Sequence, residues 1–347
     1  MAPVYQRGLP PLIPLQNIDS AADWHAQLRN AVSSGRELLS LLGLNAENSG
    51  HSELAAADFP VKVPRSFIAR MEAGNPNDPL LKQVLGHRDE LIPTPGFTDD
   101  PVGETGENIT HPGVIQKYHG RALLILSGGC AVNCRYCFRR HFPYSENRNS
   151  RTEWEQALAH IAADPSISEV ILSGGDPLLV SDRHLAALIE QLGQIPHLKR
   201  LRVHSRMPIV LPARVTDDLV KTLAAGPLQA VMVVHSNHAN ELNQEVATAL
   251  HRLNDANIPV LNQAVLLAGV NDNSDALAAL SEALFAIGVL PYYLHLLDKV
   301  RGAAHFDVPV QHGLDLIQSL EKRLPGYLVP TLVREEAGEP AKVRIRA

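Results

Sequence analysis

Cysteine is scarce in this 347-residue chain, which has only three, at positions 130, 134 and 137. An odd number of clustered cysteines does not suit a disulfide framework, so we expect a reducing, cytoplasmic location. Their spacing is Cys-x3-Cys-x2-Cys, and no fourth cysteine exists. Ferredoxin-type electron carriers hold their clusters with four cysteines, which excludes that class.

Long apolar runs and an excess of positive charge are also missing. The longest apolar candidate, residues 276–294, is interrupted by Ser281, Glu282 and Pro291, so no membrane partner is expected. Residues 1–11 lack the apolar centre of a signal peptide. A net charge of −6 argues against a nucleic-acid partner.

Apolar runs rich in branched residues alternate with helix-period stretches from residue 121 onward. The expected strands are residues 123–126, 170–172, 201–203, 230–234, 260–267 and 292–297. Between them, sets such as Leu185, Leu188, Ile189 and Leu192 share one helical face, and Leu284 and Phe285 end another. Six strand–helix units are fewer than the eight of a closed barrel, which predicts an open, partial parallel α/β barrel. A doubly wound open sheet is the structural alternative.

The first 110 residues carry only short helical patterns between prolines and polar turns. Helices are expected at residues 23–28, 36–42, 64–71 and 79–85. We therefore predict an N-terminal helical extension over residues 1–110, the partial barrel over 111–330, and a C-terminal segment over 331–347.

Unusual polar residues follow the expected strands at their C-terminal ends. They are the cysteines, residues 173–177, 204–206 and 235–238, Asn262 with Gln263, and residues 295–299. Active sites of α/β barrels and open α/β sheets lie at that edge. We therefore expect one active site there, with a histidine of the 235–238 group forming a hydrogen bond near a cofactor.

Three thiolates at this spacing can hold three irons of a cubane cluster and leave the fourth iron open for a ligand. His141 extends the series to Cys-x3-Cys-x2-Cys-x3-His, which could instead close a tetrahedral zinc site. Structural zinc modules are usually small and self-contained, whereas this segment follows a core strand. We favour the open cluster and keep a non-catalytic zinc-binding scaffold as the distant alternative.

The pattern Cys130-x3-Cys134-x2-Cys137 after the first strand of a partial barrel resembles the radical S-adenosylmethionine superfamily. The resemblance implies a [4Fe-4S] cluster on these cysteines, with S-adenosylmethionine bound at the open iron. It also implies reductive cleavage to a 5′-deoxyadenosyl radical, which needs a reductant such as flavodoxin or ferredoxin.

Residues 173–177, Ser-Gly-Gly-Asp-Pro, look like the superfamily's glycine motif, which contacts the methionine end of the cofactor. By this resemblance Gly174, Gly175 and Asp176 bind S-adenosylmethionine. The aspartate stands where the superfamily usually has glutamate. Glycines let the backbone approach a ligand, and the carboxylate can accept from an ammonium group.

Further stretches resemble the lysine 2,3-aminomutase family, whose isomerases also use pyridoxal 5′-phosphate. They are residues 117–121, 137–142, 171–177, 262–267, 291–295 and 302–306. The resemblance implies that Lys342 carries pyridoxal phosphate, with Lys299 and Lys117 as weaker candidates. It places Arg121 at the cofactor phosphate and Tyr118 beside the pyridine ring.

The same resemblance implies conversion of L-α-lysine to (R)-β-lysine. Arg139 would hold the substrate carboxylate and Asp298 the ε-ammonium group, whereas Pro330 stands where we expect the family's second acid. The family's C-terminal zinc cysteines are lacking, so no zinc is expected. Residues 137–144 look most like the members that supply β-lysine to the ligase modifying elongation factor P. A 2,3-aminomutase of glutamate or arginine is the nearer alternative.

Overall fold

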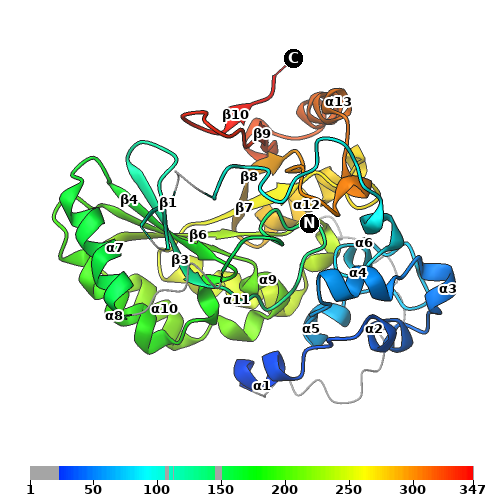
Figure 1. The fold of residues 1–347 in the computed structure, drawn as a ribbon, viewed down its shortest axis with the longest axis horizontal. Helices are drawn as coiled ribbons and strands as arrows, with labels where there is room; N and C mark the ends of the chain where they lie inside the picture. Colours follow the sequence, from blue (N-terminus) through cyan, green and yellow to red (C-terminus); the bar gives the residue numbers. More distant parts are fainter. Residues whose placement is uncertain (1–22, 106–108, 112, 145–150, 347) are drawn as a thin grey trace, which may run out of the picture.

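The computed structural model describes residues 23–105, 109–111, 113–144 and 151–346, and residues 1–11, where no signal peptide is expected, lie outside them. One open sheet dominates the described part (Figure 1), with strands in chain order from β1 at one edge to β10 at the other. The strands are β1 Ile109–His111, β2 Val114–Ile115, β3 Arg121–Ser127, β4 Glu169–Gly174, β5 Arg200–Ser205, β6 Gln229–Val234, β7 Val260–Val265, β8 Val289–His295, β9 Thr331–Arg334 and β10 Val343–Arg344.

The strands from β3 to β9 pair in parallel, whereas β1, β2 and β10 join the two edges in antiparallel fashion. All six predicted strand–helix units form, which confirms the open, partial α/β barrel. The strand β9 is an addition to the prediction, which places residues 331–347 in a separate C-terminal segment. Those residues extend the barrel sheet, and the division of the chain at residues 110 and 330 stays a prediction.

Helices between the parallel strands cover the outside of the barrel. They are α7 Arg151–Ala163, α8 Asp182–Gly193, α9 Met207–Val210, α10 Asp217–Ala224, α11 Gln244–Asp255, α12 Ser274–Ala286 and α13 Val310–Glu321. In α8 the four predicted core residues are all buried. In α12 the prediction is wrong for Phe285, which is 46% exposed and contacts the Tyr327 ring instead of the core.

Residues along the strands alternate between this apolar layer and the inside of the barrel. In β5, Leu201 and Val203 are buried in the core, whereas Arg202 and His204 line the internal pocket. Because successive strand residues point to opposite faces, a period of two places polar groups inside and apolar groups outside. The interior of the barrel therefore carries polar side chains and is not filled by apolar packing alone.

Short helices of the N-terminal region pack beside the barrel (Figure 1). They are α1 Trp24–Arg29, α2 Gly35–Leu41, α3 Ala46–Ser49, α4 Glu53–Asp58, α5 Arg65–Ile68, α6 Pro79–Lys82 and the 3-10 turn η1 Arg88–Leu91. Asp23, Ser34, Ser52 and Asp78 cap four of them through side-chain hydrogen bonds. Among the helices of the described residues, none has both the length and the apolar character that a bilayer crossing requires.

Candidate active site

A pocket of about 260 Å³ opens at the C-terminal ends of the parallel strands. Its walls come from the cysteine segment, from β2, β3, β4, β5, β7 and β8, and from the residues after β6, β8 and β9. All predicted site residues line it, namely Tyr118, Arg121, Cys130, Cys134, Cys137, Arg139, Gly174, Gly175, Asp176, Asp298 and Lys342. The convergence expected from the strand ends is therefore present.

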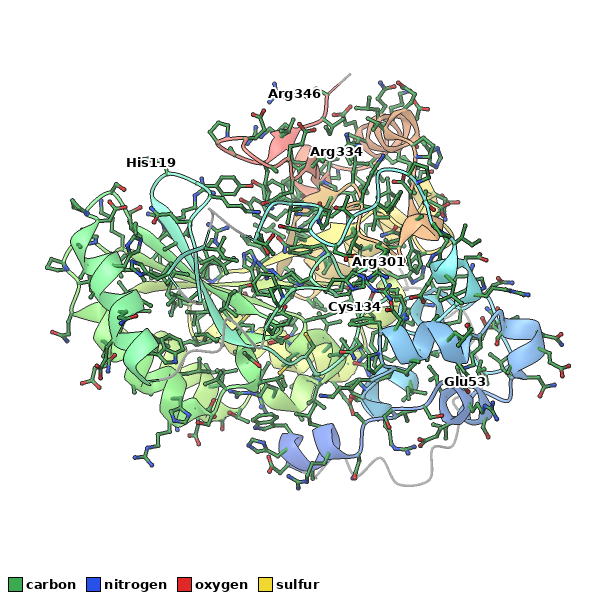
Figure 2. All side chains as sticks on the ribbon, in the orientation of Figure 1. Glu53, His119, Cys134, Arg301, Arg334 and Arg346 are labelled. Atoms are coloured by element: carbon green, nitrogen blue, oxygen red, sulfur yellow. The ribbon has the colours of Figure 1, made fainter. Side chains whose placement is uncertain are left out.

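The cysteine segment is held in place by the N-terminal helices. Lys62 Nζ donates to the Cys130 carbonyl at 2.8 Å, and Asn133 N donates to the Lys62 carbonyl at 3.0 Å. The fully buried Arg135 makes a two-pronged ion pair with Glu90, at 2.8 and 2.5 Å. In Figure 2, Cys134 lies where the N-terminal helices meet the barrel.

The glycine motif packs backbone against backbone on the same segment. Gly175 N donates to the Ser127 carbonyl at 2.7 Å, and Asp176 N donates to the Gly129 carbonyl at 2.8 Å. A Cβ atom at Gly175 would lie 2.1 Å from the Gly129 carbonyl oxygen. Gly174 has φ +118°, a conformation that side chains disfavour. The two glycines therefore set the distance between β4 and the cysteine segment.

The three cysteines are half-buried and line the pocket. Burial raises the pKa of Cys130 well above its usual value and that of Cys137 to about 11. Such thiols stay protonated unless a cation or metal replaces the proton. Cys134 already has a cationic partner, because Arg206 Nη1 lies 2.7 Å from its sulfur.

His141 does not join the cysteines, and it is not part of the pocket wall. Its ring contacts Arg301, with Nε2 3.3 Å from the Arg301 carbonyl and Nδ1 3.3 Å from the guanidinium. Within the described residues, no group of three or more His, Cys, Asp or Glu side chains could hold a single metal ion. The Cys₃His zinc hypothesis therefore finds no support, whereas thiols that ligate separate irons need not converge on one ion.

The Asp176 carboxylate is occupied by the protein. It accepts from Ser205 Oγ at 2.7 Å and from the backbone N–H groups of Leu178, Arg206 and Met207 at 2.9–3.1 Å. Burial raises the pKa of Asp176 to about 6, although these hydrogen bonds act to lower it. The residue therefore fixes the turn after β5 as well as lining the pocket.

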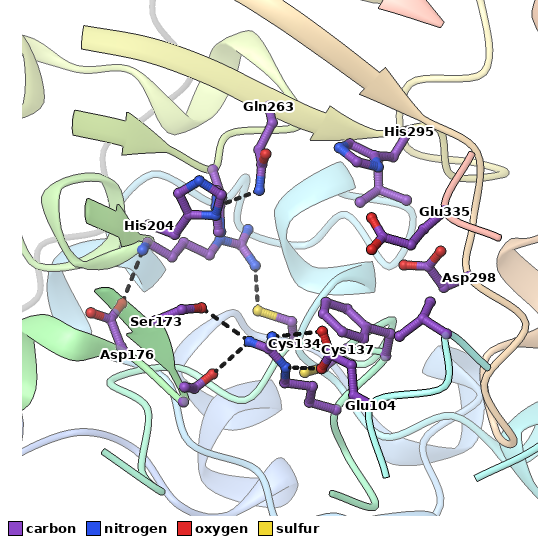
Figure 3. A pocket seen from close by; sticks show the side chains of 18 of the residues that line it. Glu104, Cys134, Cys137, Ser173, Asp176, His204, Gln263, His295, Asp298 and Glu335 are labelled. Atoms are coloured by element: carbon purple, nitrogen blue, oxygen red, sulfur yellow. Dashed lines mark hydrogen bonds and ion pairs between the residues drawn. The ribbon is translucent and has the colours of Figure 1, made fainter. Parts of the chain in front are cut away.

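Arg139 is buried and held on two sides. Its Nε and Nη2 atoms donate to the two oxygens of Glu104 at 2.5 and 2.9 Å (Figure 3). Its Nη1 atom donates to Ser173 Oγ at 3.0 Å and to the Gly174 carbonyl at 3.2 Å. A guanidinium has five N–H donors, so only one remains for a ligand while Glu104 is in this position. The sequence analysis did not identify Glu104.

Glu335, directly after β9, lines the pocket, whereas the second acid was expected at Pro330. Its carboxylate accepts from Lys117 Nζ at 2.6 Å, from Tyr118 OH at 2.8 Å and from Lys342 Nζ. Burial would raise its pKa, but the charges of Lys342 and Lys117 hold the pKa well below its usual range. Pro330 does not line the pocket, because it lies just before β9, at the opposite end of that strand.

Asp298 and Glu335 lie next to each other on the pocket wall (Figure 3). Burial and the Glu335 charge raise the pKa of Asp298 to about 7, and Asp298 Oδ1 has no hydrogen-bond partner. Nearby, burial lowers the pKa of His295 to about 3 and leaves its Nε2 without a partner. A buried polar atom without a partner is unfavourable unless a ligand supplies one.

The remaining predicted residues differ in their surroundings. Arg121 lies over the Tyr118 ring, 5.6 Å from its centre. His235, expected to form a hydrogen bond near a cofactor, has its Nε2 atom 2.9 Å from the Gln263 amide, and burial lowers its pKa to about 3. Lys299 is exposed and outside the pocket wall, so the structure offers Lys342 and Lys117, but not Lys299, to a ligand there.

The barrel and its cysteine segment define a radical S-adenosylmethionine protein, and residues 124–280 match the Radical SAM superfamily. Among solved structures, a radical SAM methyltransferase from Sphaerobacter thermophilus aligns over 64% of this chain and 68% of its own. Its TM-score is 0.45 and its sequence identity is 19%.

The relatives are more specific. The L-lysine 2,3-aminomutase of Escherichia coli (strain K12) is 52% identical over 94% of this chain and 95% of its own length. That of Clostridium subterminale is 34% identical over 93% of this chain and 77% of its own. The chain belongs to the L-lysine 2,3-aminomutase family.

Proposed function

We propose that this protein is a lysine 2,3-aminomutase, an isomerase that converts L-α-lysine to (R)-β-lysine. Its cofactors are a [4Fe-4S] cluster, S-adenosylmethionine and pyridoxal 5′-phosphate. When bound, the first two supply a carbon-centred radical, and pyridoxal phosphate supplies the carrier on which an amino group can shift. The observation that carries the proposal is one pocket holding three cysteines, the acids Asp298 and Glu335, and Lys342.

The residues fit these groups. Cys130, Cys134 and Cys137 offer three thiols for the cluster, and Gly174 to Asp176 border the space beside them for S-adenosylmethionine. Lys342 lines the same pocket as Tyr118 and Arg121 and would carry pyridoxal phosphate there. The partnerless Nε2 atom of His295 and Oδ1 atom of Asp298 support binding of a polar ligand between the walls.

Lysine suits the charges of this pocket. Arg139 would bind the α-carboxylate through its remaining N–H and through the donors now on Glu104. Asp298 and Glu335 would bind the ε-ammonium. Two neighbouring carboxylates would repel the side chain of glutamate, so this pair argues against a glutamate 2,3-aminomutase. Lysine is therefore the preferred substrate.

We place the protein in the cytoplasm, with flavodoxin or ferredoxin as the reductant. Its β-lysine would pass to the ligase that modifies elongation factor P. The resemblance of residues 137–144 to that group of enzymes supports this destination. Co-expression with elongation factor P and the ligase, followed by intact-protein mass spectrometry, should show the added lysyl mass only when Cys134 is intact.

The central test is anaerobic. Purified protein should contain iron and sulfide and show iron–sulfur and pyridoxal absorbance. With S-adenosylmethionine and dithionite it should form β-lysine from lysine, but no β-amino acid from glutamate or arginine. A matched Cys134→Ala variant should bind pyridoxal phosphate and form no product. A colourless wild-type protein with one zinc, or one that forms no β-lysine, would contradict the proposal.

A further inference from the structure

A buried polar network connects the cysteine segment to the N-terminal helices through Arg206. This arginine follows β5 and is 5% exposed. Its Nη1 atom donates to Cys134 Sγ at 2.7 Å. Its Nη2 atom donates to Gln83 Oε1 at 2.7 Å and to Glu241 Oε2 at 3.1 Å. The guanidinium therefore donates from one nitrogen to the cysteine sulfur and from another to Gln83 and Glu241.

The N-terminal helices provide much of this anchoring. Gln83 directly follows α6, and Phe67 belongs to α5. The Arg206 guanidinium carbon lies 5.5 Å from the centre of the Phe67 ring and 5.6 Å from that of Tyr136. Aromatic faces stabilise a cation without neutralising it. Arg206 is thus a charged group in a fixed orientation beside one thiol.

We propose that Arg206 is a positioning residue that raises the reduction potential of the iron–sulfur cluster through its hydrogen bond and charge at Cys134. The inference rests on the cluster of the proposed function. Reduction adds one electron and one negative charge to a cluster and its thiolates, so a nearby cation favours the reduced form. Hydrogen bonds to sulfur, net charge and solvent exposure set the potentials of iron–sulfur clusters.

Burial makes the effect of this charge larger than it would be at the surface. Water screens the field of an exposed arginine, whereas Arg206 acts through a medium of low polarizability. Glu241 opposes it from the far side of the guanidinium. Glu241 also accepts from Gln83 Nε2 at 3.1 Å and from the backbone N–H groups of Asn237 and His238 at 2.9 and 3.1 Å. Glu241 therefore keeps three hydrogen-bond donors when Arg206 is replaced. The folded protein should tolerate the substitution for this reason.

The test is a redox titration of the bound cluster, followed by electron paramagnetic resonance without S-adenosylmethionine or lysine. For Arg206→Met, the ratio of reduced to oxidised cluster at a fixed potential should fall about tenfold, a shift of about 59 mV to lower potential. The cluster potential of Arg206→Lys should lie between those of this variant and the wild type. Lysine keeps the positive charge but lacks the forked N–H donors of a guanidinium. Glu241→Gln should shift the potential upward, because it removes the opposing charge.

Arg70→Met is the matched control. Arg70 lies over the same Phe67 ring at 5.1 Å and donates to the Glu241 carbonyl, but it contacts no cysteine. Its replacement should lower the potential much less than Arg206→Met does, because it removes a more distant charge and no hydrogen bond to sulfur. Iron and sulfide content and the melting temperature are measured for every variant, so that a loss of cluster is separated from a shift in potential.

Equal potentials in the wild type and Arg206→Met would overturn the inference while leaving the proposed function intact. If the Arg206→Met variant binds no iron, its cluster potential cannot be measured. The Glu241→Gln variant then tests the inference, because the reduction potential of its cluster must rise. A fall or no change there would show that Arg206 has only a structural role. A wild type without iron and sulfide would instead refute the proposed function.

Discussion

Glu335→Gln should remove most of the preference for a substrate with a cationic side chain. Glu335 is the ionised member of the acid pair, since the charges of Lys342 and Lys117 hold its pKa below the usual range while the pKa of Asp298 is raised to about 7. A hydrogen bond to a charged group contributes about 1.5–3 kcal/mol. Loss of one such bond to the ε-ammonium should raise KM for lysine roughly ten- to hundredfold, because each 1.4 kcal/mol is about a factor of ten.

The assay compares lysine with norleucine, which has the same carbon chain without the ammonium group. KM for lysine should rise in Glu335→Gln, whereas the inhibition constant of norleucine should stay near the wild-type value. Glu336→Gln is the control, because Glu336 is exposed and its carboxylate is 3.9 Å from Arg334. Pyridoxal absorbance checks that the variant still binds the cofactor that we propose for Lys342. A parallel rise of both constants would refute the assignment, because it would indicate general damage to the pocket.

Three further predictions follow from charges and close contacts in the pocket. Because the raised pKa of Asp298 favours its neutral form below about pH 7, lysine affinity should improve as the pH rises from about 6 to about 8 and then level off. Isothermal titration calorimetry should show no such rise for Asp298→Asn. Glu104→Gln should lower the melting temperature by leaving the buried Arg139 charge unpaired, and added lysine should raise it more than in the wild type. An equal lysine shift in both proteins would show that Glu104 does not occupy the carboxylate position. Gly175→Ala should lower the iron content, because its Cβ would collide with the Gly129 carbonyl, whereas Gly326→Ala, with nothing within 4 Å, should bind iron normally.

The barrel could be predicted from sequence because its signals are local. Branched apolar runs and helical periods of three to four residues recur in order, and α8 shows all four predicted core residues buried. Phe285 was misplaced because a helical period does not reveal where the covering layer ends. The strand β9 was missed because four residues give too short a pattern to separate from the turn before it.

The cysteines could be predicted because their spacing lies within eight residues of the chain. Glu335 and Glu104 could not, because their partners are remote in sequence. Arg206 was expected at the active-site edge as one of residues 204–206, but its contact with Cys134 was not. Glu335 is 217 residues from Tyr118, and Arg206 is 72 residues from Cys134. One usable signal was present for Glu335, since it directly follows a parallel strand like the other polar site residues.

The chain's own groups occupy the two positions that we propose for the charged ends of a lysine molecule. Glu104 places a carboxylate on Arg139, and Lys342 places an ammonium on Glu335. Binding of lysine therefore exchanges ion pairs and does not create new ones, so the net electrostatic gain is small. Once Lys342 carries pyridoxal phosphate, its ammonium is no longer offered to Glu335, and the ε-ammonium of the substrate can take that place. Selectivity then depends on the separation of the two charges, because only an amino acid of the right length can pair with Arg139 and Glu335 at once.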